Sequence, residues 1–342
     1  MSLEDGRKSR VTLLDVAREA NVSRATASLV IRKSPLVGTQ TRKRVEDAIK
    51  RLGYVYNMGA ARMRAQRSHT VGVVVPNLTN PFFAELLSGI EATLDPVNMV
   101  VLLANSWESL DRQETIIRRM REHGVDGLVV CPAAGSDATL LARAADWALP
   151  LVQALRYVSL EEGDYAGTDY AGGMRQAVDY LVSLGHRRIG FVVGGAVHSA
   201  YRERVQGFQL AMQAHGLDAA DIIELPFQLS RAAEATHLLF ERPTPPTAAI
   251  CFNDVVALGL SGGLHDLGMT VGRDFSIIGF DNVAEADMMR PKLTSVSTDP
   301  VLIGRNAARL LLDRLADTRR PYERLVNNTA LVVRQSCGRP AS

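Results

Sequence analysis

The chain lacks the features of a secreted or membrane protein. Its 342 residues contain only three cysteines, Cys131, Cys251 and Cys337, which lie far apart and are odd in number. Such usage fits a reducing compartment better than a disulfide framework. No apolar run reaches the ~20 residues that span a bilayer, and the first residues lack the apolar stretch of an export signal. We therefore expect a cytoplasmic protein with no membrane partner.

Sequence motifs of catalysis and metal binding are missing as well. The glycine pairs Gly194-Gly195 and Gly262-Gly263 belong to no dinucleotide or P-loop motif. No G-x-S-x-G nucleophile elbow occurs, and the seven histidines show no metal-ligand spacing. The sequence therefore predicts no enzyme, no metal and no organic cofactor.

The charge of the chain is unevenly distributed. Residues 1–67 hold 15 Lys and Arg against six acidic residues, a net charge of +9, while the remaining 275 residues carry −7. A basic head on a mildly acidic body is typical of a module that binds a polyanion such as nucleic acid. On charge alone, a solvated basic face without a partner is an equally good interpretation.

Helix signals are dense in this basic head. Thr12 and Asp15 have the spacing of a capping box, and Ser23 is a second N-cap after a turn at Asn21. A third amphipathic helix is expected over 39–52. Two helices separated by a very short turn are the pattern of a helix-turn-helix, whose second helix enters the major groove of DNA.

The head also resembles a known family. The runs Val11-Thr12-Leu13-Leu14-Asp15-Val16-Ala17, Val22-Ser23 and Leu52-Gly53-Tyr54 are similar to the head of the LacI/PurR (GalR-LacI) family of transcriptional regulators. The resemblance implies that Arg24, Ala25 and Leu29 face base edges, while Ser23, Thr26 and Ser28 hold phosphates or cap the helix. The full set of implied DNA contacts is Thr12, Ser23, Arg24, Ala25, Thr26, Ser28, Leu29, Asn57, Ala60, Met63 and Arg64.

The segment from Asn57 to Arg64 matches the hinge helix of that family. In the family, two such helices meet at a dimer axis and an apolar side chain, usually Leu, wedges into the minor groove. Met63 takes this position here. The resemblance thus implies a homodimer on double-stranded, pseudo-palindromic operator DNA. Without the preceding head, a plain linker would be the preferred interpretation.

The rest of the chain alternates between apolar strands and helices, as in α/β folds. Strands are expected over 70–76, 97–104, 127–131, 151–154, 189–193, 222–225, 248–252 and 276–280, and helices over 81–94, 110–122, 137–148, 171–184, 202–215, 231–240 and 255–267. This alternation resembles the periplasmic-binding-protein-like body of the same family. The resemblance places a return crossover at 291–299, a helix of the first lobe at 300–316 and a strand of the second lobe at 331–334.

The expected fold class is an all-α helix-turn-helix head plus an α/β periplasmic-binding-protein-like body of two doubly wound lobes. The expected domains are a DNA-binding domain over 1–56, a hinge helix or linker over 57–67, an N-terminal sensor lobe over 68–166 plus 296–324, and a C-terminal effector-binding lobe over 167–295 plus 325–338.

In such a body, ligands bind beyond the carboxyl ends of the strands, in the cleft between the lobes. The family resemblance selects Asn77, Phe82, Arg156, Arg204, Phe227, Asn253 and Asp281 as effector contacts, with a structural role open for each. Arg204 matches the arginine that grips the effector through paired hydrogen bonds. Arg156 stands where relatives can present an acidic residue, so the two arginines favour an anionic effector such as a sugar acid.

The combined hypothesis is a ligand-responsive transcriptional regulator, a repressor that acts on the nucleoid as a dimer. A small metabolite in the cleft would change lobe closure and thereby DNA affinity. Two other classes remain as alternatives. One is a stand-alone sugar-binding protein such as a transport receptor, and the other is an α/β enzyme with a regulatory head.

Overall fold

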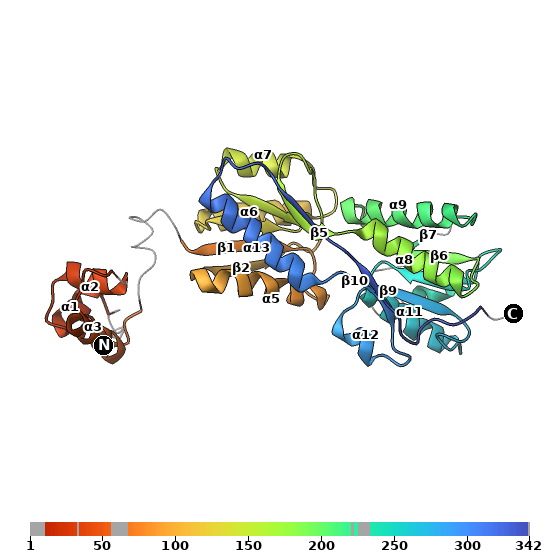
Figure 1. Ribbon diagram of the computed structural model, residues 1–342, viewed down its shortest axis with the longest axis horizontal. Coiled ribbons are helices and arrows are strands. Elements are labelled where there is room, and N and C mark those ends of the chain that lie inside the picture. The colour runs from red at the N-terminus through yellow and green to blue at the C-terminus, as the bar shows by residue number, and fades with distance from the viewer. Residues whose placement is uncertain (1–10, 33, 56–67, 220–221, 225–232, 341–342) are drawn as a thin grey trace, which may run out of the picture. The chain divides into compact units, whose positions relative to one another are not determined.

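The computed structural model describes residues 11–32, 34–55, 68–219, 222–224 and 233–340 (Figure 1). The chain divides into a head that extends to Ser68 and a body that begins at His69. None of the helices in these described ranges is long and apolar enough to cross a membrane.

The head is a three-helix unit. Its helices are α1 (Leu13–Glu19), α2 (Arg24–Ile31) and α3 (Thr39–Leu52). The capping box is confirmed, because the Thr12 hydroxyl accepts from the Asp15 amide while the Asp15 carboxylate accepts from the Thr12 amide at 2.8 Å. The small core consists of Val16, Ala17, Ala20, Ala27, Val30, Val45 and Ala48.

The N-terminal lobe of the body is built on a six-stranded parallel sheet. The strand order is β11-β5-β4-β3-β1-β2, with bounds β1 Thr70–Val75, β2 Val100–Asn105, β3 Gly127–Val130, β4 Leu151–Ala154, β5 Asp164–Thr168 and β11 Arg324–Asn327. One face is covered by α5 (Phe82–Leu94) and α13 (Pro300–Ala316), and the other by α6 (Leu110–Glu122) and α7 (Thr139–Asp146). Because both faces are covered, the strand β1 is an almost continuous apolar run.

The C-terminal lobe repeats this architecture. Its strand order is β12-β10-β9-β8-β6-β7, and β12 alone of these strands runs antiparallel to its neighbour. The strands are β6 Ile189–Val193, β7 Ile222–Glu224, β8 Ala248–Cys251, β9 Ser276–Asp281, β10 Thr294–Ser297 and β12 Ala330–Val332. The helices are α8 Tyr170–Ser183, α9 Ser199–Ala214, α11 Asp254–Asp266 and α12 Ala284–Met288. The helices α8 and α9 pack on one face, whereas α11 packs on the other.

The chain crosses from one lobe to the other three times. The crossings lie between β5 and α8, between β10 and α13, and between β11 and β12. Figure 1 shows α13, drawn in blue, returning to the first lobe beside α5. The expected return crossover and the helix over 300–316 are therefore present.

Several expected elements differ from the structure. The strand expected from 97 begins at Val100, because Asp95–Val97 form a 3-10 helix after Leu94. The helix expected over 231–240 contains a 3-10 helix at Ala235–Leu239. The strand β5 and the helix α12 were not predicted from the sequence. The second lobe was expected to end at residue 295 before the chain returns, but the strand β10 of that lobe extends two residues further. Residues 325–327 were expected in the second lobe, but they belong to β11, which joins the sheet of the first lobe.

Candidate functional site

The second helix of the head presents a short polar face. Arg24 and Ala25, in the first turn of α2, are exposed. The Ser23 hydroxyl accepts from the Thr26 amide at 3.1 Å and hydrogen-bonds the Thr26 hydroxyl at 2.9 Å. Leu29 is half-buried, whereas Ala27 and Val30 point into the core. The helix therefore offers its N-terminal turn to a partner, as a recognition helix does.

Two of the predicted DNA-contacting residues, Ser28 and Thr12, make hydrogen bonds within the head. Ser28 is buried, and its hydroxyl accepts from the Arg32 guanidinium at 2.8 Å. The geometry therefore assigns Ser28 to helix packing and gives no support to a phosphate contact. Thr12 is exposed and caps α1. The predicted contacts Asn57, Ala60, Met63 and Arg64 lie outside the described residues.

The body holds a cavity of about 570 Å³ between its lobes. It is lined by the segments that follow β1, β2, β3, β4, β6 and β8, and by the end of β9. Parallel sheets place their binding loops at these carboxyl ends. Six of the seven predicted effector residues line the cavity: Asn77, Phe82, Arg156, Arg204, Asn253 and Asp281. Phe227 lies outside the described residues.

Arg204 is the central cation of this cavity. Its guanidinium lies 4.0 Å from the ring centroid of Tyr170 and 4.4 Å from those of Phe252 and Phe280. It is 4% exposed, and burial lowers its pKa. The aromatic faces offset part of the cost of burying the charge. Its Nε atom is buried without a hydrogen-bond partner in the described part of the chain, so one donor remains for a ligand.

Asp281 faces this cation from the end of β9. Its Oδ1 lies 3.9 Å from Nη2 of Arg204. Burial raises the pKa of Asp281, and the nearby Arg204 charge opposes that shift. The φ angle of Asp281 is 110°, which a residue with a side chain rarely adopts and which costs ~1–3 kcal/mol. Strain of this kind is common where a side chain must point at a ligand.

Two further polar groups face the cavity from helix starts. Asn253 caps α11 through its Oδ1, which accepts from the Val256 amide at 2.9 Å, so its amide nitrogen is left to donate. His198 caps α9 through Nδ1, which accepts from the Tyr201 amide at 3.2 Å. The ring proton of His198 is therefore on Nε2, a buried donor without a partner within the described ranges. Burial and nearby arginines lower the pKa of His198 to about 2, so the ring is neutral.

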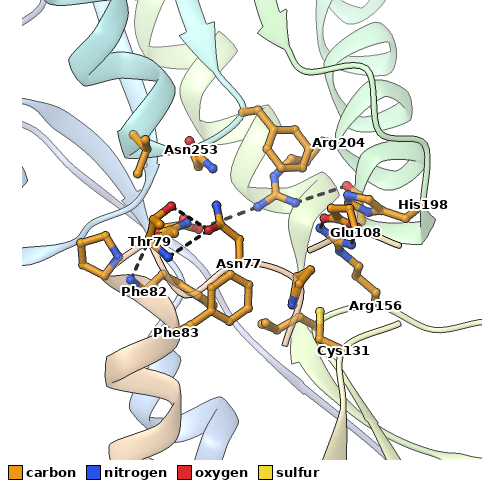
Figure 2. Close-up of a pocket in the computed structure, with 18 of the residues that line it drawn as sticks. Asn77, Thr79, Phe82, Phe83, Glu108, Cys131, Arg156, His198, Arg204 and Asn253 are labelled. Atoms are coloured by element: carbon orange, nitrogen blue, oxygen red, sulfur yellow. Dashed lines mark hydrogen bonds and ion pairs between the residues drawn. The ribbon is translucent and has the colours of Figure 1, made fainter. Parts of the chain in front are cut away.

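Arg156 lines the cavity, but its charge is already paired. Its Nη1 and Nη2 donate to the two carboxylate oxygens of Glu108 at 2.9 and 2.8 Å. The Glu108 carboxylate also accepts from the Ala134 amide at 3.1 Å. This bidentate pair removes one of the two grounds for expecting an anionic effector, because Arg156 adds no net positive charge to the cavity, and leaves Arg204 as the other. Figure 2 shows the pair beside His198.

Aromatic side chains form the apolar walls. Phe82 and Phe83 meet edge to face, with ring centroids 5.5 Å apart, and both are buried. Trp107 also lines the cavity but is 56% exposed. Trp107 and Glu108 adopt successive left-handed conformations, with φ angles of 53° and 57°. Two adjacent side-chain-bearing residues in this region cost ~1–3 kcal/mol each, so this loop holds both groups in an unfavourable conformation.

The lobes are hydrogen-bonded to each other next to the cavity. The Tyr157 amide donates to the Ser199 hydroxyl at 2.8 Å, and the Tyr157 hydroxyl donates to the Glu203 carboxylate at 2.7 Å. Burial raises the pKa of Tyr157 to about 12 and also raises the pKa of Glu203. Because α9 carries Ser199, Glu203 and Arg204, the helix that contacts the cavity also contacts the opposite lobe.

Several residues that line the cavity were not predicted from the sequence, namely Trp107, Glu108, Tyr170, His198 and Phe252. Trp107 and Glu108 stand in a loop with no periodicity to mark them. His198 had a usable signal, since it precedes a helix that carries a predicted effector residue, but histidine is an unusual N-cap.

Together, the helix-turn-helix head and a body with a cavity between its lobes define a DNA-binding regulator with a ligand-binding domain. Comparison with known proteins supports that class. Residues 12–57 match the bacterial regulatory proteins of the lacI family, and residues 178–337 match a periplasmic binding protein-like domain. Catabolite control protein A of Priestia megaterium is 35% identical over 304 residues, which cover 88% of this chain and 91% of the relative. The chain belongs to the lacI family of bacterial regulatory proteins.

A second relative is the HTH-type transcriptional repressor PurR of Photobacterium profundum, which is 32% identical over 95% of this chain and 98% of its own length. Among solved structures, the complex of the transcriptional regulator CelR with cellobiose aligns with a TM-score of 0.73 at 32% identity, covering 96% of this chain and all of that one. A regulator of the same family from Enterococcus faecium with bound ribose aligns with a TM-score of 0.71 at 30% identity, over 80% of this chain and 100% of the other.

The lac repressor dimer bound to operator and an anti-inducer has the same fold, with a TM-score of 0.85 at 24% identity over 96% of this chain and 99% of that one. The predicted family and fold class are thereby confirmed. The DNA-binding regulator is favoured over a stand-alone sugar-binding protein, and the characterised relatives above are regulators rather than enzymes.

Proposed function

We propose that this chain is a cytoplasmic repressor that binds a pseudo-palindromic operator as a homodimer and responds to a neutral sugar in the interlobe cavity. It needs no metal or coenzyme and catalyses no reaction. The family relationship and the exposed first turn of α2 support the DNA-binding role. The basic charge of residues 1–67 supports it further, because DNA binding gains much of its affinity from phosphate neutralisation.

The observation that carries the effector assignment is the pairing of charges in the cavity. Arg156 pairs with Glu108, Arg204 faces Asp281, and His198 is neutral. A neutral ligand with many hydroxyl groups suits such a site, since each hydroxyl both donates and accepts. The sugars in the cellobiose and ribose complexes of two relatives are neutral as well.

The position of the cavity between the lobes provides a mechanism by which sugar binding changes DNA affinity. Asn77 and Phe82 belong to the N-terminal lobe and Arg204 and Asn253 to the C-terminal lobe, so one ligand contacts both lobes (Figure 2). A ligand that binds one relative orientation of the lobes more tightly shifts the population toward it. The resulting coupling to DNA affinity is expected to be ~1–3 kcal/mol.

A gel-shift titration of the full chain with DNA from upstream of its own gene tests the DNA-binding role. We expect a specific shift that weakens as salt is raised. Arg24→Ala should abolish the specificity and leave sugar binding intact, while Lys50→Ala, at an exposed position in the last turn of α3, serves as the matched control. A purified, folded protein that gives no specific shift would contradict the proposal.

Isothermal titration calorimetry tests the effector class. Neutral sugars should bind, and their binding should persist in chelator-treated protein. Tight binding of a sugar acid, with no response to neutral sugars, would show that the charges in the cavity do not act as a balanced set.

A further inference from the structure

We propose that Asp254 is a positioning residue, whose carboxyl group holds the backbone at the end of β9 so that Asp281 points at a ligand in the cavity. This role rests on the proposed function, because it concerns the same cavity. Asp254 is not one of the residues that line the cavity in the described part of the chain. Its effect on a ligand must therefore pass through a residue that does line it.

The segment that Asp254 contacts is strained. Asp281 has a φ angle of 110° and Asn282 one of 59°, so two successive residues with side chains lie at positive φ. An asparagine tolerates the left-handed region, whereas an aspartate at 110° lies outside the regions that such residues normally occupy. A conformation of this kind persists only where the surrounding contacts determine it. The backbone at the end of β9 therefore needs contacts that hold it.

Asp254 supplies such contacts. Its Oδ2 accepts from the Val283 amide at 2.8 Å, and its Oδ1 accepts from the Ser295 hydroxyl at 2.6 Å. The Ser295 hydroxyl in turn accepts from the Asn282 amide at 3.1 Å. The two amides that follow Asp281 are thus fixed, one directly and one through Ser295. Because these bonds are made to the backbone, they set the direction in which the Asp281 side chain leaves it.

The carboxyl group of Asp254 fits closely against the strand. A β-carbon on Gly279 would lie 2.0 Å from Oδ1 of Asp254, so the glycine leaves the space that the carboxyl group occupies. Asp254 is 1% exposed, and burial raises its pKa to about 7. Burying a carboxyl group costs free energy that an apolar side chain of similar size would not cost. The hydrogen bonds of Asp254, rather than its packing, therefore account for its position.

Other residues contact the side chains of this segment instead of its backbone. Nη2 of Arg204 lies 3.9 Å from Oδ1 of Asp281, and Nη2 of Arg334 donates to Oδ1 of Asn282 at 2.8 Å. These contacts orient side chains that the backbone has already placed. Without Asp254, the backbone of Asp281 can relax toward a common φ angle, which moves its carboxyl group relative to Arg204 and to a ligand.

Hydrogen exchange and calorimetry on the full-length protein test this role together. Exchange of the Asn282 and Val283 amides is measured without sugar, and the binding of ribose, glucose, galactose and cellobiose is measured by calorimetry. The variants are Asp254→Ala, Asp254→Asn, Asp281→Ala and the double alanine variant. Ser276→Ala is the matched control, because it removes a buried hydroxyl at the opposite end of β9 from Asp281 and Ser276 does not line the cavity.

Asp254→Ala should speed the exchange of both amides at least tenfold and weaken the sugar that binds the wild-type protein about tenfold. Asp254→Asn keeps an acceptor for the Val283 amide and should restore both values to within about threefold of the wild-type protein. In the Asp281→Ala background, Asp254→Ala should weaken the sugar no further, because both substitutions act through one side chain. Ser276→Ala should lower stability and leave both measurements unchanged.

If Asp254→Ala does not fold, Ser295→Ala replaces it, because it removes only the hydroxyl that joins Asp254 to the Asn282 amide. Faster exchange at Asn282 and weaker sugar binding are then expected. The proposal is overturned if the amides exchange at the wild-type rate, or if Asp254→Ala weakens the sugar equally with and without Asp281. If no sugar in the panel binds the wild-type protein, the effector class of the proposed function is wrong, and the exchange rates alone decide whether Asp254 holds the segment.

Discussion

At the scale of single residues, the cavity depends on a cation that aromatic rings hold in place. Arg204 is buried among Tyr170, Phe252 and Phe280, and its Nε donor has no hydrogen-bond partner among the described residues. A planar guanidinium can stack on these rings and donate from its edge at the same time. An ammonium group on a flexible stem cannot do both.

Arg204→Lys should therefore weaken sugar binding by about 30-fold, or ~2 kcal/mol, with little change in DNA binding by the sugar-free protein. Isothermal titration measures the first effect and gel shift the second. The matched control is Arg202→Lys, an exposed position on the same helix, which should leave both unchanged. Equal sugar affinity in Arg204→Lys and the wild-type protein would show that Arg204 is a packing residue.

A second residue, Asp254, should make stability depend on pH. Its carboxyl is buried, accepts from the Ser295 hydroxyl at 2.6 Å and from the Val283 amide at 2.8 Å, and has its pKa raised from 3.8 to about 7 by burial. Because the folded pKa exceeds the unfolded one, the favourable contribution is complete below the unfolded pKa. It is lost as pH rises through about 7.

Asp254→Asn can accept from Val283 and donate to Ser295, so the variant should fold. Relative to the wild-type protein it should be more stable at about pH 9 than at about pH 5, as measured by thermal unfolding. Asp274→Asn is the control, since the Arg273 guanidinium lowers the pKa of that half-buried carboxyl to about 2 and it stays ionised at both values. A constant difference for Asp254→Asn across this range would contradict the assignment.

The family resemblance selected the predicted residues of the cavity, and the apolar runs of the sequence placed several of them at the ends of strands. Asn77, Asn253 and Asp281 are of this kind. The sequence could not predict the Arg156–Glu108 pair, since the two residues lie 48 positions apart and the pairing depends on which loops meet in space. For this reason Arg156, taken together with Arg204, suggested an anionic ligand, whereas the pairing of Arg156 with Glu108 favours a neutral one.

At the scale of elements, α13 must return from the C-terminal lobe and pack closely on α5. The close approach occurs at two glycines. A β-carbon on Gly304 would overlap the Leu86 carbonyl oxygen, and one on Gly89 would overlap the carbonyl of Val301. Backbone atoms of the facing helix cannot move aside as a flexible side chain can, so both positions require glycine.

Gly304→Ala should lower the stability of the body by ~3 kcal/mol through overpacking. Gly262→Ala is the matched control, because Gly262 is an exposed residue within α11 whose β-carbon would meet only Ala233 at 3.9 Å. Its gain in helix propensity should raise stability by up to ~1 kcal/mol. Thermal unfolding separates the two, and an unchanged midpoint for Gly304→Ala would show that the helices are less tightly packed.

Elements that are stabilised by distant partners were the ones that the sequence missed. The strand β5 begins at Asp164, a fully buried carboxylate that accepts from Arg314 of α13 at 2.9 Å. A sequence such as Asp-Tyr-Ala-Gly-Thr has too few apolar side chains to signal a strand, and the ion pair that satisfies Asp164 joins residues 150 positions apart. In contrast, the capping box of α1 and apolar strands such as β1 rely on near neighbours and were predicted correctly.

At the scale of the whole molecule, the chain combines a DNA-binding head with a body whose two lobes line one cavity. The bonds from Tyr157 to Ser199 and Glu203 link the lobes on the same helix that holds Arg204. A ligand on Arg204 therefore acts on an element that already contacts the opposite lobe. This arrangement explains how a small molecule could change the relation of the lobes, as a ligand-controlled regulator requires.

The most direct test of this account is a fluorescence-anisotropy titration of the full chain with its upstream DNA, in the presence and absence of a neutral sugar that calorimetry has shown to bind. The account predicts specific binding whose affinity changes by about fivefold or more with the sugar. Arg204→Lys should bind the DNA but lose this response at the same sugar concentration. The account would be contradicted by DNA affinity that stays constant while the sugar saturates the cavity, or by no specific DNA binding at all.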